Sequence, residues 1–183
     1  MGVTLPGMAL PSFVDEIDRA LLEALQEDCK TSLNKLGEKV GLGAPAVLER
    51  VRKLESAGVI TAYQAVLDGK RLGLDITAFV GVSINYPKDI AKFLTMVAKR
   101  PEVLECHHVT GGHTLLLKVK TENTASLERA ISALREVEGV TRTETMVVLS
   151  TAAESARIPL PALPATESAP PKRRNSKNLR EAS

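Results

Sequence analysis

Hydrophobic residues recur every three or four positions in three short segments near the N-terminus, a spacing that predicts helices with one buried face. Their apolar residues are Ile17, Leu21, Leu22 and Leu25 in the first, Leu33, Leu36 and Val40 in the second, and Val47, Val51 and Leu54 in the third. The boundary signals are Asp15 with Asp18 in a capping box, Ser32 as an N-cap, Pro45 in a first turn, and Gly41 and Gly58 as stops. We therefore expect three short helices that share one core.

After Gly58 the pattern changes from helical to alternating. The expected elements are a strand or wing over 59–67, a turn over 68–73, a strand over 76–85, a helix from Pro87, strands over 103–110 and 115–120, a helix capped by Thr124 and a strand over 140–149. From residue 76 the order is β-α-β-β-α-β, which predicts a ferredoxin-like antiparallel sheet with both helices on one face. The fold class is thus α+β, a three-helix (winged) helix-turn-helix domain followed by a ferredoxin-like domain.

The second face of this sheet is expected to carry apolar and β-branched side chains. We assign to it Phe79, Val103, Val109, Thr143 and Thr145. An apolar face of this kind is typical of a contact between subunits, so we predict a dimer.

Composition and charge divide the chain further. We expect a flexible N-terminus over 1–13, the helix-turn-helix domain over 14–62, a linker over 63–75, the ferredoxin-like domain over 76–153 and a disordered basic tail over 154–183. From Pro159 onward, five basic residues less two acidic ones give +3, which leaves −1 on residues 1–158 of a chain whose formal net charge is +2. The tail either adds phosphate contacts or only aids solubility.

The chain has 183 residues, of which 44% are hydrophobic. No apolar run approaches the roughly 20 residues that cross a bilayer, and the first residues lack the positive charge of a secretory signal. Cys29 and Cys106 lie far apart and predict reduced thiols. These features predict a cytoplasmic protein without a membrane partner.

The third helix carries the clearest functional signal. Its outward positions are Pro45, Glu49, Arg52, Lys53 and Ser56. Clustered cations on the last of three short helices suit the major groove of double-stranded DNA. A solvated charged face explains the same residues equally well.

The turn Thr110-Gly111-Gly112-His113-Thr114 offers backbone amides and hydroxyls to the carboxylate of a small ligand, although a hairpin turn needs glycine in any case. Cys106, His107, His108 and His113 raise the question of a metal, but adjacent strand residues point to opposite faces, so we expect no metal site. We find no catalytic triad, carboxylate pair or P-loop, and so predict no catalytic residues and no enzyme.

Four separated segments together resemble the Lrp/AsnC family of bacterial and archaeal transcriptional regulators. They are DEIDRALLEAL, GLGAPAVLERVRKLESAGVITAYQAVLD, PEVLECHHVTGGHTLLLKV and GVTRTETMVVLST, within about residues 14–153. The resemblance implies sequence-specific DNA binding, a small effector such as an amino acid at contacts between dimers, assembly of dimers up to octamers, and no cofactor. It implies DNA-binding positions at Ser32, Lys35, Ala44, Pro45, Ala46, Glu49, Arg50, Arg52 and Lys53, and effector-binding positions at Thr110, Gly111, Gly112, His113 and Thr114.

Two departures from the family pattern stand out. Gly43 replaces the serine that usually caps the recognition helix, and Thr114 replaces the aspartate of the family's TG-x-x-D turn. Two alternatives remain at this point. One is a tetrapyrrole enzyme like the sirohaem decarboxylases, which resemble this family and use histidines; the other is a ligand-binding oligomerisation module without DNA function, suggested by the negative charge of residues 1–158.

Overall fold

The computed structural model describes residues 14–85 and 87–161. The chain forms two compact units, one made of the residues up to Tyr63 together with those from Ser155, the other of Gln64–Glu154. The polypeptide therefore passes between the units twice, once on the way out and once on the way back.

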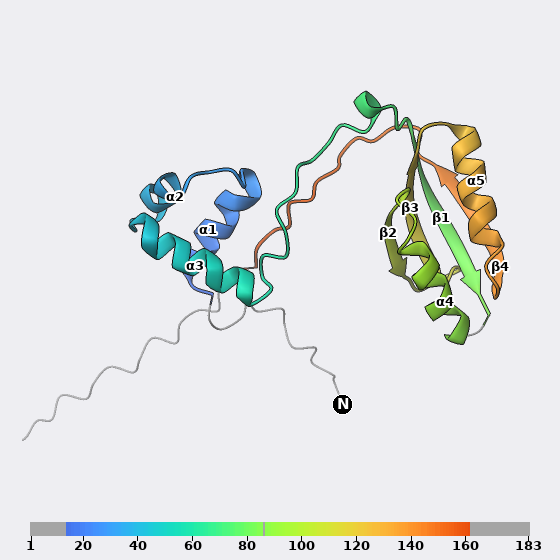
Figure 1. Cartoon of the computed structure of the whole chain (residues 1–183), viewed down its shortest axis with the longest axis horizontal. Helices are drawn as coiled ribbons and strands as arrows, with labels where there is room; N and C mark the ends of the chain where they lie inside the picture. The colour runs from blue at the N-terminus through green and yellow to red at the C-terminus, as the bar shows by residue number, and fades with distance from the viewer. Residues whose placement is uncertain (1–13, 86, 162–183) are drawn as a thin grey trace, which may run out of the picture. The chain divides into compact units, whose positions relative to one another are not determined.

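The first unit contains the three predicted helices (Figure 1). They are α1 (Glu16–Glu27), α2 (Leu33–Val40) and α3 (Ala44–Ser56). The predicted capping box at the start of α1 is present, since the N–H of Asp18 donates to Asp15 Oδ1 at 2.8 Å. Ser32 Oγ caps α2, and Gly41 ends it in the left-handed conformation with φ 71°.

The turn between α2 and α3 depends on a glycine that the sequence pattern did not single out. The N–H of Leu42 donates to the carbonyl of Gly37 at 3.0 Å. A Cβ at Gly37 would overlap the carbonyl oxygen of Leu42. Any side chain at Gly37 would push the turn away from α2. The absence of a side chain therefore allows the turn before α3 to pack closely against α2.

The second unit has the predicted β-α-β-β-α-β order. Its elements are β1 (Ile76–Ile84), α4 (Pro87–Val97), β2 (Val103–His108), β3 (Leu115–Thr121), α5 (Thr124–Arg135) and β4 (Val140–Val147). The strands form one antiparallel sheet in the order β2-β3-β1-β4 (Figure 1). Both helices pack on one face of the sheet, where the core contains Phe93, Val97, Leu127 and Leu134 with Ala78, Val80, Val82, Leu115, Leu117 and Val119.

Our assignment of residues to the open face of the sheet is partly wrong. Thr143 pairs with Val82, Thr145 with Val80, and Val103 with Val119, and these partners belong to the helix-covered core. Directly paired residues share a face, so all three predicted residues lie on the covered side. The reason is two register shifts, at Val103/Glu105 and at Ser83/Ile84, which change the phase of the edge strands.

Phe79 does lie on the open face, where Lys118 and Met146 pair with it. By register the same face carries Leu116, Glu144 and Arg142. It is therefore a mixture of apolar and charged side chains rather than the apolar surface that we expected.

Two local predictions need correction. Within the described chain no strand is assigned between α3 and β1, so the strand or wing expected over 59–67 is wrong; a short 3-10 helix, η1 (Lys70–Leu72), follows that segment. Alternation favours an extended backbone, but a strand also needs a neighbour to bond with. The N-cap of α5 is Asn123 and not Thr124. The predictions for residues 1–13 and 162–183 lie outside the described residues.

Candidate nucleic-acid interface

The outer face of α3 carries the residues that the helical period placed there. Val47, Val51 and Leu54 are buried, and the outward set, Pro45, Glu49, Arg52, Lys53 and Ser56, is exposed. The N-cap of α3, Gly43, makes no side-chain hydrogen bond to the first turn. Helix starts present backbone N–H groups that bind phosphate oxygens well, and here no capping side chain competes for them.

An open hollow of about 550 Å³ lies over the α2–α3 turn, between residues 34 and 44. At the start of α2, Ser32 Oγ accepts the N–H of Lys35 at 3.4 Å, and both residues are exposed. The start of α2, the turn and the exposed face of α3 therefore belong to one unit with its own core.

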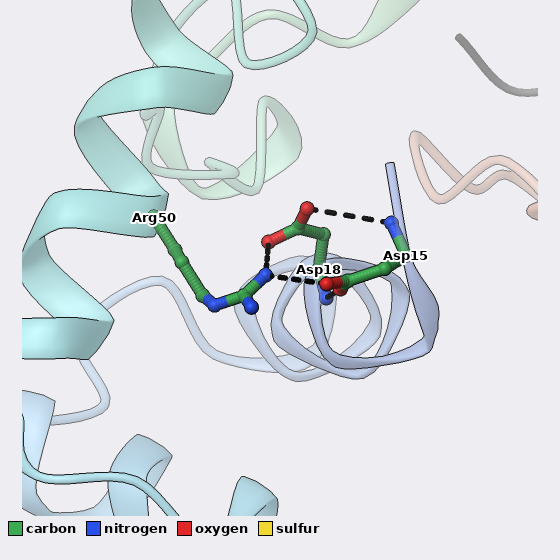
Figure 2. A network of polar contacts seen from close by, with 3 residues as sticks. All are labelled: Asp15, Asp18 and Arg50. Carbon is green, nitrogen blue, oxygen red and sulfur yellow. Dashed lines mark hydrogen bonds and ion pairs between the residues drawn. The ribbon is translucent and has the colours of Figure 1, made fainter. Parts of the chain in front are cut away.

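Arg50 has a different environment from Arg52 and Lys53. Figure 2 shows its side chain directed at the N-terminus of α1, where Nη1 lies 2.8 Å from Asp15 Oδ2 and 2.8 Å from Asp18 Oδ1. The Asp18 side chain is only 2% exposed. A buried carboxylate needs a compensating charge, and Arg50 supplies it while joining α3 to α1.

These contacts also shift the ionisation of the pair. The hydrogen bonds to Asp18 and then to Asp15 raise the pKa of the Arg50 guanidinium above its ordinary value. Desolvation opposes ionisation of Asp15, but the hydrogen bonds from the Asp18 N–H and from Arg50 together outweigh it and lower the pKa of that carboxyl. The charge of Arg50 is thus already compensated by two carboxylates, which makes this side chain less suited to binding a phosphate.

Tyr63 is a further contact that the sequence did not indicate. Its hydroxyl donates to Glu55 Oε1 at 2.9 Å, which attaches the chain after α3 to the last turn of that helix. Burial and then the hydrogen bond to Glu55 raise the pKa of Tyr63 to about 12. The phenol therefore stays protonated and able to donate at neutral pH.

In the second unit, the predicted effector turn lies between β2 and β3. Thr114 is engaged with the backbone of β1: its Oγ1 accepts the N–H of Ile84 at 3.0 Å and donates to the carbonyl of Ile84 at 3.4 Å. Its own N–H donates to the carbonyl of Val82 at 2.9 Å. The hydroxyl at Thr114 therefore holds the turn to the sheet.

His113 gives the turn its most unusual group. Its imidazole lies against Gly81, where a Cβ would overlap the ring. Nε2 is 3.6 Å from Glu144 Oε2, and Arg142 Nη2 donates to the same oxygen at 2.8 Å. Nδ1 is buried and has no hydrogen-bond partner among the described residues. Glu144 and Arg142 were missed by the sequence reasoning because β4 brings them to the turn only through its pairing with β1.

The cysteine and histidine side chains do not assemble into a metal site in the described structure. Across residues 14–85 and 87–161, no group of three His, Cys, Asp or Glu residues is placed to hold a metal ion. His107 Nε2 instead lies 3.2 Å from Glu105 Oε2. Over the same residues, every helix is too short or too polar to span a bilayer.

A helix-turn-helix unit followed by a separate βαββαβ unit is an arrangement typical of DNA-binding transcriptional regulators. The family model of the AsnC-type helix-turn-helix domain matches residues 14–55. That of the Lrp/AsnC ligand binding domain matches residues 77–158. The chain belongs to the Lrp/AsnC family of transcriptional regulators, which confirms the family and the fold class expected from the sequence.

Individual relatives agree with this assignment. The chain is 33% identical over 147 residues to the HTH-type transcriptional regulator FL11 of Pyrococcus horikoshii, covering 80% of this chain and 97% of that one. It is 38% identical over 139 residues to the leucine-responsive regulatory protein of Rhizobium meliloti, covering 74% and 89%.

Solved structures show the same fold. A transcriptional regulator from Neisseria meningitidis in complex with L-Met superposes with a TM-score of 0.75 at 29% identity, covering 79% of this chain and 96% of that one. Escherichia coli AsnC gives a TM-score of 0.73 at 28% identity, covering 79% and 97%.

Proposed function

We propose that this regulator binds double-stranded DNA through the exposed face of α3. The observation that carries the proposal is the separation of the two faces of α3, since its apolar side closes the core and its opposite side exposes Arg52 and Lys53. Arg52 and Lys53 bind phosphates or base edges, and Ser32 and Lys35 hold the backbone at the start of α2. Arg50 acts by positioning α3.

Sequence preference comes from a small set of groups. Ala44, Pro45 and Ala46 present few hydrogen-bonding groups to base edges. Glu49 and Arg52 are the polar side chains on the exposed face that suit direct contacts with bases. We therefore expect DNA shape and deformability to contribute much of the selectivity.

Salt-dependent binding to a duplex from the chain's own upstream region tests this assignment. Arg52→Gln and Lys53→Gln should each flatten the plot of log affinity against log salt by about 0.9 if each contacts one phosphate. Lys92→Gln is a matched control, because Lys92 is an exposed cation on α4 of the second unit. It pairs there with Glu138 of the same unit. Unchanged slopes in both α3 variants would contradict the placement.

We propose that the open sheet face forms the contact between subunits of a homodimer, with larger assemblies built from that dimer. Phe79, Leu116 and Met146 supply its apolar part, and Lys118 and Glu144 supply charges of both signs. Phe79→Glu should shift the sedimentation of the protein at micromolar concentration toward the monomer. A wild-type protein that sediments as a monomer at that concentration would refute the dimer.

We propose that a small effector, such as an amino acid, binds at the turn Thr110–Thr114. The Neisseria relative was solved with L-Met, and in the present chain Gly111 and Gly112 offer backbone N–H groups to a carboxylate. With Thr114 bound to Ile84, Glu144 is the nearby carboxylate suited to an ammonium group. Calorimetric titration with a panel of amino acids tests this, and Glu144→Gln should weaken any ligand whose amino group is required.

We also propose that the regulator has no catalytic role. We expect it to act in the cytoplasm, where genomic DNA is found. The tetrapyrrole-enzyme alternative relies on histidines, but His107 pairs with Glu105 on the surface while His113 lies against Gly81. Binding of an added tetrapyrrole, followed by its absorption spectrum, would revive that alternative.

A further inference from the structure

A short segment after β4 packs on the unit that contains α1 and α3. Residues from Ser155 group with this first unit and not with the sheet. We call residues 155–161 the strap, and Figure 1 shows its orange-red trace ending at the first unit. We expected a disordered tail from residue 154, but the strap makes specific contacts with the helices.

The sequence of the strap restricts it to an extended backbone. It ends with Ile158-Pro159-Leu160-Pro161. A residue that precedes proline is confined largely to extended conformations, and each proline has a fixed φ of about −65°. The unbound strap therefore has few conformations to lose, which lowers the entropic cost of docking.

The end of α1 binds the backbone of the strap. The N–H of Ile158 donates to Gln26 Oε1 at 2.8 Å, and Gln26 Nε2 donates to the carbonyl of Ile158 at 3.2 Å. The Ile158 side chain is not what α1 binds, since that residue is 65% exposed. This paired exchange fixes which residue of the strap faces α1, as a strand pairing would.

Two residues on, Leu160 covers the place where α1 and α3 meet. It packs on a cluster whose buried members are Val14, Leu22 and Leu54. Leu22 lies on α1 and Leu54 on α3, where Leu54 is fully buried. Leu160 therefore closes the contact between the two helices from the buried side of α3.

The same part of α3 presents the cations that we propose bind DNA. Arg52 and Lys53 directly precede Leu54 and are exposed on the opposite side. Because the residues of one helical turn move together, a displacement at Leu54 also displaces these two cations. Arg50 fixes α3 to the start of α1, and the strap provides a second fixing point near the end of α1.

This second fixing point comes from outside the matched helix-turn-helix domain. The family model of that domain ends at residue 55, whereas the strap begins at residue 155. The DNA-binding unit is therefore discontinuous in the sequence.

We propose that Leu160 and Gln26 are positioning residues for DNA binding, which hold α3 against α1 at the angle that brings Arg52 and Lys53 to the duplex. The proposal rests on the DNA-binding function proposed above. In this role the strap touches no DNA and acts through α1 and α3.

The test uses the full chain and a 30-base-pair duplex from the chain's own upstream region. Affinity is measured at a temperature at which every variant keeps the full helical circular dichroism signal. Leu160→Ser removes the apolar cover, Gln26→Ala removes the paired hydrogen bonds, and Leu160→Met is the conservative replacement. Ile158→Ala is the matched control within the strap, because it removes an exposed side chain and keeps the backbone hydrogen bonds.

Leu160→Ser and Gln26→Ala should each weaken DNA binding by about two- to thirtyfold, the range for residues that act on a binding site without touching the ligand. Leu160→Met and Ile158→Ala should bind within about twofold of wild type. In a background that already carries Arg52→Gln and Lys53→Gln, Leu160→Ser should cost less than about twofold, because the cations that it positions are gone.

Strap variants that melt at a lower temperature but bind DNA with wild-type affinity would reveal a purely stabilising contact and overturn the positioning role. An undiminished effect of Leu160→Ser in the Arg52→Gln, Lys53→Gln background would also overturn it. If Leu160→Ser lacks the full helical signal, Leu160→Ala and Gln26→Ala take its place. Failure of the DNA-binding function is distinct, since the wild type itself would then not bind the duplex.

Discussion

Replacement of Arg50 by methionine separates a residue that positions α3 from one that contacts DNA. Methionine keeps much of the length and apolar stem of arginine but removes both hydrogen bonds to Asp15 and Asp18, each 2.8 Å long. Breaking a buried ion pair costs about 3–5 kcal/mol because one charge is left uncompensated. Here the Asp18 side chain is 2% exposed, but those of Arg50 and Asp15 are 31% and 51% exposed.

Solvent screening at the exposed side of the network reduces that cost, so we expect Arg50→Met to destabilise the first unit by about 2–3 kcal/mol. For a unit of this size the melting temperature should fall by roughly 10 °C or more. Thermal unfolding followed by helical circular dichroism measures the loss, and salt-dependent DNA binding below the transition measures any change in phosphate contacts.

Arg52→Met is the matched control, because Arg52 is an exposed arginine on the same helix. It should change stability by less than about 0.5 kcal/mol yet flatten the salt slope. Arg50→Met should instead lower stability and leave the salt slope unchanged. The assignment of Arg50 fails if its replacement leaves stability unchanged and lowers the slope.

Acid gives a second check on the same network. The pKa of Asp15 in the folded state lies below its ordinary value of 3.8, so its stabilising contribution is present above pH 3.8 and is lost as the pH falls through the folded-state pKa. The stability difference between wild type and Arg50→Met should therefore narrow in that acidic range. A difference that is constant down to pH 2 would contradict ionisation of Asp15 as its source.

Three further perturbations follow from local geometry. Gly37→Ala should destabilise the first unit by about 1–3 kcal/mol in thermal unfolding, because the added Cβ meets the turn before α3. Thr114→Val should cost about 1–3 kcal/mol in the second unit, since the partly buried end of β1 at Ile84 loses its partner. Cys29 should react with a thiol reagent well before Cys106 at pH 8, because Cys29 is exposed and burial raises the pKa of the Cys106 thiol.

Each of the two substitutions has a control in the same segment of the chain. Glu38→Ala changes an exposed residue of α2 next to Gly37, and Thr110→Val changes an exposed residue of the turn between β2 and β3. Both should be close to neutral for stability. Equal losses in variant and control, or equal labelling rates for the two thiols, would contradict the contacts described.

The sequence predicted the faces of α3 because burial repeats with the helical period. Val47, Val51 and Leu54 fall on one stripe, and Arg52 and Lys53 fall opposite. Arg50 lies beside the buried stripe, and its partners are 32 and 35 residues earlier in the chain. Periodicity within one helix carries no information on such a distant pairing, so the ion pair could not be predicted.

The sheet faces show a second limit of sequence patterns. Alternation predicted the buried face of β1 correctly, since β1 is central and Ala78, Val80 and Val82 follow one phase. The edge strands change phase at their register shifts, which placed Thr143 and Thr145 on the covered side. A bulge depends on the pairing of two strands and leaves little trace in either strand alone.

The packing of Leu160 on the helix-turn-helix unit has a consequence for the order in which the molecule is made. A ribosome releases the chain from the N-terminus, and domains generally fold as they emerge. Leu160, which completes the core around Leu22 and Leu54, emerges only after the entire sheet has been synthesised. The helix-turn-helix unit is encoded first, but it gains the packing contact of Leu160 only after the whole βαββαβ unit has been synthesised.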